Sequence, residues 1–180
     1  PILGLSQMFL QMTTDYPYTS LFAFNFWWIG GGWKNDSVVN FLISDQAWGT
    51  VLWVISQIII LFWFFKNRSE GNFFLAAALS LLAFFVLPTR VHERYLFPFF
   101  AYGVISAVIF GRAIWFIYGV LTVIHFFNLY FVYTYYNPNF LKIEAISQLI
   151  SKLSVIFATL TVFIFSFMLG LLLKKKWGKI

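Results

Sequence analysis

The sequence contains no cysteine, only two histidines and few charged residues, which occupy 10% of its 180 positions. Without cysteine, disulfide bonds and thiolate chemistry are excluded, and the redox compartment stays undetermined. A globular domain is about half apolar and about a quarter charged, whereas this chain is 61% hydrophobic. The composition therefore places the chain among membrane proteins.

Aromatic residues are what the sequence has in excess. They make up 23% of the chain, with 25 Phe and 8 Trp, which suits lipid-facing surfaces and interfacial belts. The net charge of +6 does not indicate a nucleic-acid partner, because the basic residues stand at the ends of apolar runs. In that position they set membrane topology and contact anionic lipids, so we expect membrane lipids among the partners and no nucleic acid.

Five apolar segments approach the roughly 20 residues that a membrane-spanning helix needs. They cover about 48–65, 73–87, 95–111, 113–136 and 153–173. The stretch 140–151 is predicted to lie in the interface as a short amphipathic helix. The predicted fold class is all-α: a polytopic transmembrane helix bundle of about five to six spans.

Residues 1–47 differ from the helical bundle predicted over 48–180. Positions 2–12 are interpreted as the end of an incomplete helix. The stretch 16–33 is aromatic but interrupted by a proline, an asparagine and three glycines, which favours a re-entrant or interfacial segment. Because the chain starts at a proline and shows no signal peptide, we interpret it as the C-terminal fragment of a longer polytopic protein.

The distribution of Lys and Arg predicts an orientation. A cytoplasmic C-terminus places seven basic residues inside, namely Lys66, Arg68, Arg112, Lys174, Lys175, Lys176 and Lys179. It leaves five outside, namely Lys34, Arg90, Arg94, Lys142 and Lys152. We therefore predict an integral protein of a bacterial plasma membrane or the endoplasmic reticulum, with its C-terminus in the cytoplasm.

The stretch 87–98 places two arginines, a histidine and a glutamate between two apolar runs. Ionisable groups near a bilayer core are costly, so they are usually paired, turned inward and functional. Pro88 and Pro98 prevent a regular helix from passing through. A broken, polar stretch at membrane depth persists only where protein or a water-filled cavity covers it. We predict a functional site here rather than a surface loop with snorkelling arginines.

Arg90 and Arg94 are predicted to bind an anionic substrate, because forked guanidinium donors match phosphate or carboxylate oxygens. His92 and Glu93 are the candidate catalytic residues, since an imidazole titrates near neutrality and a carboxylate can orient it. We expect Glu93 to pair with one of the arginines. No cofactor is indicated: one histidine and one glutamate are too few for a metal site, and a divalent metal is compatible with the pattern without being indicated by it.

A second group of candidates is aromatic and polar, and is predicted to form a sugar-facing, substrate-binding platform. It consists of Tyr16, Tyr18, Asn25 and Trp27; Tyr95, which follows Arg94, is a further substrate-binding candidate. The alternative is an interfacial aromatic belt.

Other polar residues have a structural interpretation. Asp15, Asp36 and Asp45 are interpreted as solvated loop residues, with Asp15 retained as a candidate because it adjoins the aromatic block. His125 and Asn128 lie one turn apart in the fourth span, and we expect them to bond to neighbouring helices.

The residues 90–98, R-V-H-E-R-Y-L-F-P, resemble the His-Glu-Arg-Tyr-Leu-Phe-Pro block of polytopic glycosyltransferases of the C-type (GT-C) superfamily. That group includes dolichyl-phosphate-mannose mannosyltransferases and bacterial relatives. The residues 16–27 are similar to a second block that precedes the first one in those proteins. Phe22 departs from the pattern, which has a small polar residue at that position.

The resemblance implies sugar transfer, with inversion, from a polyprenyl-phosphate donor to a glycan, lipid or protein acceptor on the extracytoplasmic face. In such enzymes the catalytic carboxylate lies in an early outer loop, upstream of the residues here, so the resemblance implies that this fragment alone is inactive. The alternative is a transporter or flippase for an anionic or lipid-linked substrate. That function would need paired broken helices in related halves, and the sequence shows no repeat. A non-catalytic scaffold is a third alternative.

Overall fold

The computed structural model describes residues 16–139 and 142–173. Its five long helices are α3 (Asp45–Lys66), α4 (Glu70–Val86), α5 (Phe97–Phe110), α6 (Arg112–Tyr136) and α7 (Glu144–Leu173). Its short elements are α2 (Phe26–Ile29), the 3₁₀ turn η1 (Glu93–Leu96) and the antiparallel strands β1 (Val39–Phe41) and β2 (Ile43–Ser44). The all-α prediction is confirmed, with one small hairpin added. The partial helix predicted over 2–12 lies outside the described residues.

Within the described residues, four helical stretches are long and apolar enough to cross a membrane. They are α3, η1 with α5 (Glu93–Phe110), α6 and α7. The remaining helix, α4, is apolar but only 17 residues long, or about 26 Å at 1.5 Å per residue. Together these helices account for the five segments expected from the sequence.

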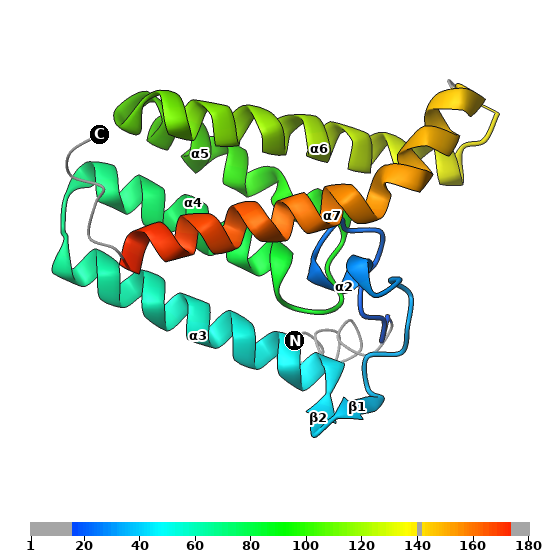
Figure 1. Ribbon diagram of the computed structural model, residues 1–180, viewed down its shortest axis with the longest axis horizontal. Coiled ribbons are helices and arrows are strands. Elements are labelled where there is room, and N and C mark those ends of the chain that lie inside the picture. Colours follow the sequence, from blue (N-terminus) through cyan, green and yellow to red (C-terminus); the bar gives the residue numbers. More distant parts are fainter. Residues whose placement is uncertain (1–15, 140–141, 174–180) are drawn as a thin grey trace, which may run out of the picture.

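The interfacial helix expected over 140–151 is not a separate element. From Glu144 onward the chain forms the first turns of α7, which continues to Leu173. No proline interrupts this run, so nothing stops the helix where its polar part meets its apolar part. Its 30 residues would extend about 45 Å, longer than a bilayer core of about 30 Å. The first turns therefore project beyond the bundle (Figure 1).

Successive long helices run in opposite directions, so the connections gather at two ends of the bundle (Figure 1). One end carries the loop 87–96, the segment 16–44 and the start of α7, and we call it the motif end. The basic residues Lys34, Arg90, Arg94 and Lys142 lie at the motif end, and Lys66, Arg68 and Arg112 lie at the opposite end. This grouping matches the sequence expectation; the side of the membrane that each end faces stays a prediction.

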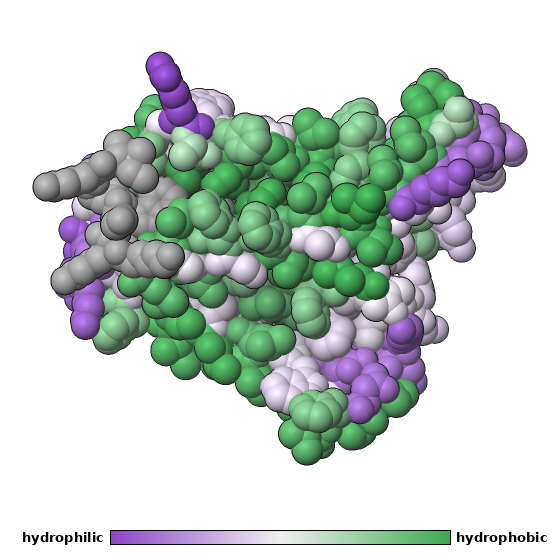
Figure 2. All heavy atoms as spheres, viewed as in Figure 1, coloured by the Kyte–Doolittle hydropathy of each residue, from purple (hydrophilic) through white to green (hydrophobic). Residues whose placement is uncertain are grey.

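Helix α4 lies at the centre of the bundle and packs against α3, α5 and α7. Leu75, Leu79 and Leu82 are fully buried on it, as are small residues such as Ala83. In lipid the hydrophobic effect does not drive helices together, and small side chains allow the close approach on which their packing then depends. The outer surfaces of the surrounding helices stay apolar (Figure 2), as expected for surfaces that face lipid.

The segment 19–25 has no regular structure, yet every one of its residues is buried. Irregular backbone in apolar surroundings needs protein partners for its polar groups. Asn128 of α6 supplies two of them: its amide Nδ2 donates to the carbonyl of Phe22, and its Oδ1 accepts from the N–H of Phe24. Asn128 therefore bonds to this segment, where we had expected a neighbouring helix.

His125 also differs from expectation. Its two ring nitrogens have no hydrogen-bond partner among the described residues. Instead the imidazole packs between two rings of α5, with centroid distances of 4.9 Å to Phe97 and 5.1 Å to Phe100. His125 contacts a neighbouring helix through ring packing and not through the predicted hydrogen bond.

Candidate functional site

The loop 87–96 is set by the two prolines, as predicted. Helix α4 ends at Val86 just before Pro88, and Pro98 stands in the first turn of α5. A proline is tolerated there because the first N–H groups of a helix have no intrahelical partner. The break leaves the loop free to adopt the irregular backbone that presents the charged residues.

Two close approaches at Leu87 position the start of this loop. The indole Nε1 of Trp27 donates to the carbonyl of Leu87 at 2.7 Å. On the other side, Gly49 of α3 lies so close that a Cβ there would stand 2.9 Å from the Leu87 carbonyl oxygen and 3.1 Å from the N–H of Thr89. Only glycine allows this approach of helix and loop without a shift of the backbone.

A buried ion pair fixes the start of the charged stretch. Arg90 donates through Nε to Asp36 Oδ2 at 2.7 Å and through Nη2 to Oδ1 at 3.0 Å. Thr89 adds a hydroxyl bond of 2.8 Å to the same carboxylate, and Asp36 is fully buried. The interpretation of Asp36 as a solvated loop residue is therefore wrong. Its partner stands 54 positions away, which local sequence patterns do not reveal.

His92, Glu93 and Arg94 line a cavity of about 380 Å³ at the motif end. Its lining consists of His92, Glu93, Arg94, Tyr16, Phe22, Trp33, Val132 and Tyr136. The cavity thus joins the two sequence blocks with the end of α6. One wall is charged and the other is mostly aromatic.

The charged wall is loosely paired. The carboxylate of Glu93 lies 3.8 Å from Nη1 of Arg94 and 3.8 Å from Nδ1 of His92. Both separations exceed hydrogen-bond length. The side chain of Arg94 is 57% exposed, whereas that of Glu93 is 11% exposed. The expected pairing of Glu93 with an arginine is found with Arg94, whose side chain stays more than half exposed.

The surroundings of His92 favour its neutral form. Burial first, and then the positive charge of Arg94, lowers the pKa of His92 from its ordinary value of 6.5. The ring is held edge-on by Tyr95 at 5.5 Å and Tyr16 at 6.2 Å between centroids. A neutral imidazole offers one donor and one acceptor, so His92 can contact either a hydroxyl group or a phosphate oxygen.

Two residues of the aromatic wall have a strained backbone. Phe22 and Trp33 both have φ near 64°, and their ring centroids lie 4.8 Å apart. A left-handed backbone costs a residue other than glycine roughly 1–2 kcal/mol. Such strain clusters at binding and active sites, where the surroundings enforce it.

Four of the nine predicted site residues line the cavity, namely His92, Glu93, Arg94 and Tyr16. The other five are not in its lining. Tyr95 contacts the His92 ring, and Tyr18 packs on Trp33 at 5.1 Å. Arg90 binds Asp36, Trp27 binds Leu87, and Asn25 caps α2 by accepting from two backbone N–H groups.

Sequence reasoning missed four lining residues: Phe22, Trp33, Val132 and Tyr136. The first two carried a weak signal, because they belong to the aromatic stretch before the hairpin. Val132 and Tyr136 carried none, since they stand at the end of an ordinary apolar run. Their place in the lining follows only from how α6 packs.

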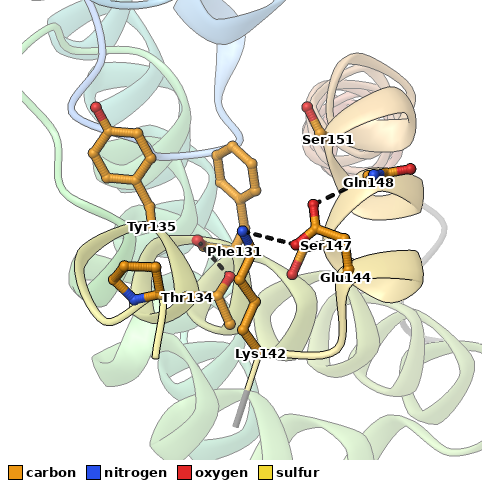
Figure 3. A pocket seen from close by; sticks show the side chains of 9 residues that line it. Phe131, Thr134, Tyr135, Lys142, Glu144, Ser147, Gln148 and Ser151 are labelled. Atoms are coloured by element: carbon orange, nitrogen blue, oxygen red, sulfur yellow. Dashed lines mark hydrogen bonds and ion pairs between the residues drawn. The ribbon is translucent and has the colours of Figure 1, made fainter. Parts of the chain in front are cut away.

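A second cavity, of about 260 Å³, lies between the end of α6 and the first turns of α7 (Figure 3). Its charged groups satisfy one another: Lys142 Nζ lies 2.9 Å from Glu144 Oε2, and Gln148 Nε2 donates to Glu144 Oε1 at 3.3 Å. Figure 3 shows these three side chains joined. The ion pair here is therefore tight, whereas the one in the motif-end cavity is loose.

Metal ligands are scarce in this part of the protein. Within residues 16–139 and 142–173, no three His, Asp or Glu side chains come together in a way that could hold a metal ion.

Comparisons with family models, with curated proteins and with solved structures gave no match to this chain.

Proposed function

We propose that this chain is the C-terminal transmembrane module of an integral-membrane glycosyltransferase, and that the motif-end cavity binds its polyprenyl-phosphate sugar donor. One observation carries the proposal. The half-exposed side chain of Arg94, the imidazole of His92 and the buried carboxylate of Glu93 share a cavity with a wall of aromatic rings, at the end of membrane-length helices. The resemblance of the two sequence blocks to GT-C enzymes supports the same function.

The cavity suits a lipid phosphate. Such a donor presents its anion at the membrane surface while its isoprenoid tail stays in the bilayer. Arg94 is exposed and held only loosely by Glu93, so its fork can turn to phosphate oxygens. The guanidinium of Arg90, by contrast, is directed at Asp36 and Gln46. We therefore assign the phosphate contact to Arg94 and a positioning role to Arg90.

In the proposed reaction, an acceptor hydroxyl oxygen forms a bond to the anomeric carbon while the bond from that carbon to the phosphate oxygen breaks. The phosphate leaves with the bonding electron pair, and the hydroxyl proton goes to a base. By the resemblance, this base is a carboxylate upstream of the present chain. A cation already placed beside the phosphate stabilises the charge that develops on it.

The remaining cavity groups have complementary roles. His92, neutral and held edge-on by two tyrosines, would contact the sugar or the phosphate. Glu93 lies equally far from His92 and Arg94 and would position both. The Phe22 ring stands where the resembled block has a small polar residue, so this chain presents an apolar surface there. A flat apolar wall suits the C–H face of a sugar or an isoprene unit.

Sugar transfer is tested with membranes that contain the whole protein and a radiolabelled polyprenyl-phosphate mannose. We expect label to move to an acceptor with release of polyprenyl phosphate, and we expect Arg94→Ala and His92→Ala to reduce this transfer. The alternative function, transport, predicts that the labelled lipid crosses the bilayer of proteoliposomes with its sugar bond intact. Crossing without bond cleavage would overturn the glycosyltransferase proposal.

A further inference from the structure

The hairpin that precedes α3 has an apolar tip that is largely exposed. Its exposed fractions are 51% for Val38, 65% for Val39, 68% for Phe41 and 78% for Leu42. Figure 1 shows the hairpin standing off from the bundle at the start of α3, and Figure 2 shows apolar side chains at this protruding corner beside a hydrophilic area. Four large apolar residues within five positions form an exposed patch, not scattered surface residues.

The hairpin is fixed to the helix that follows it. The indole Nε1 of Trp48 donates to the carbonyl of Phe41 at 2.7 Å, and the two rings stack with centroids 6.3 Å apart. Asn40 Nδ2 donates to Asp45 Oδ2 at 2.8 Å. These contacts tie the hairpin to the first turn of α3, so its tip has a defined position relative to the membrane-length helix.

Leu42, at the tip of the hairpin, has an unusual backbone conformation. Leu42 has φ of 61°, a left-handed conformation that glycine or asparagine adopts at little cost and other residues at roughly 1–2 kcal/mol. A leucine in this position gives up stability that glycine would keep. Packing against the described residues does not compensate for this cost, because the Leu42 side chain is 78% exposed.

The length of α3 sets the depth of the hairpin. Its 22 residues extend about 33 Å, which matches a hydrocarbon core of about 30 Å. When α3 spans this core, Asp45 lies at the level of the lipid headgroups, and so does the hairpin just before it. The apolar exposed surface of α3, with Val51 and Ile55, continues directly from the hairpin. Trp48, in the first turn of α3, takes the place that indole rings favour at the interface.

We propose that the hairpin formed by residues 38–44 inserts its apolar tip into the interfacial layer of the lipid bilayer beside α3. The partner is lipid, at the boundary between headgroups and acyl chains. Asp36 stands two residues before this tip and is bound by Arg90, at the start of the charged loop. The inserted hairpin would therefore hold the motif-end cavity at the level of the headgroups. The proposal does not depend on the enzymatic activity of the chain.

Spin labelling tests the insertion directly, because the chain has no native cysteine. A nitroxide is attached at Leu42→Cys, and its collision rates with oxygen and with the water-soluble complex Ni-EDDA are measured in lipid nanodiscs. Ser37→Cys, exposed before the hairpin, gives the aqueous reference. Ile58→Cys, 61% exposed on α3, gives the lipid reference.

The label at position 42 is expected to collide with Ni-EDDA several-fold less often than the label at position 37, and with oxygen more often. Access to Ni-EDDA equal to that at position 37 would place the tip in water. Low access to both reagents would place it under protein, either a second copy or another part of a longer chain. Either result overturns the proposal.

Leu42→Asn separates lipid contact from folding, because asparagine tolerates the left-handed backbone. We expect its melting temperature in detergent to equal or exceed that of the wild type, since no protein contact of the tip is lost. In nanodiscs, a label at position 39 of this variant should collide with Ni-EDDA more often than the same label in the parent chain. A lowered melting temperature in detergent, or unchanged access at position 39, would contradict the insertion.

Discussion

Asn128 binds the backbone on both sides of the turn at Phe22, 106 positions earlier in the chain. Its Nδ2 donates to the Phe22 carbonyl at 2.6 Å, and its Oδ1 accepts from the N–H of Phe24 at 3.0 Å. Phe22 has a left-handed backbone there and directs its ring into the motif-end cavity. A polar residue of helix α6 therefore shapes the aromatic wall without lining the cavity.

Replacing Asn128 by leucine should destabilise the protein strongly. The substitution leaves the Phe22 carbonyl and the Phe24 N–H buried and unpaired, which lowers the free energy of unfolding by about 2–4 kcal/mol. Chemical unfolding in detergent measures this loss. Asn137→Leu is the control, because Asn137 is exposed and donates only to its own helix, at the Tyr133 carbonyl. Equal losses in the two variants would contradict the role given to Asn128.

The Asp36–Arg90 ion pair should be structural. Asp36→Asn removes the buried carboxylate that accepts from two nitrogens of Arg90 and from the Thr89 hydroxyl, so we expect the free energy of unfolding to fall by about 3 kcal/mol. The double variant Asp36→Asn, Arg90→Gln should lose less than the sum of the two single variants. Arg68→Gln, an exposed arginine at the opposite end, should change stability little. Additive losses at positions 36 and 90 would contradict the pairing.

Gly49→Ala should displace the charged loop. The added Cβ would meet the backbone of Leu87 and Thr89, and overpacking of this kind costs about 1–3 kcal/mol. At Gly119 of α6 a Cβ meets nothing within 4 Å. Gly119→Ala should therefore be neutral or stabilising by up to about 1 kcal/mol. Melting temperatures of the two variants compare them, and a Gly49→Ala protein as stable as wild type would show that the approach of helix and loop is not tight.

Stability should depend on pH through His92. Its pKa is lower in the folded protein than its ordinary value of 6.5, so the unfolded chain binds the proton more readily. Stability therefore rises with pH between the folded pKa and 6.5, and falls as acid protonates the buried ring. His92→Gln should flatten this part of the curve of unfolding free energy against pH. Parallel curves for wild type and variant would contradict the predicted burial effect.

The helices and the broken loop were readable from the sequence. Run lengths of apolar residues gave the five long helices, and Pro88 and Pro98 gave the break between α4 and α5. These features follow from local chemistry, namely hydrophobic length and the missing N–H of proline. The prediction for the stretch 140–151 failed because polarity changes along α7 while no proline interrupts the helix.

The site was readable only in part, because its partners come from distant positions. His92, Glu93 and Arg94 stand together in the chain and also in the cavity. Tertiary packing brings Asp36 to Arg90 and places Tyr136 in the cavity wall. The periodicity of the local sequence does not reveal either contact. Phe22 stood out as a departure from a resembled block, and its ring proves to line the cavity.

Binding of a lipid phosphate at Arg94 is tested most directly by titrating polyprenyl phosphate into the purified protein and measuring the affinity by native mass spectrometry. A charged hydrogen bond is worth roughly 1.5–3 kcal/mol, so Arg94→Ala should bind about tenfold to a hundredfold more weakly. Arg94→Lys should recover part of the loss, because it keeps the charge without the fork, and Arg68→Ala should bind like the wild type. A folded Arg94→Ala protein with wild-type affinity would contradict the assignment of this cavity to a lipid-phosphate donor.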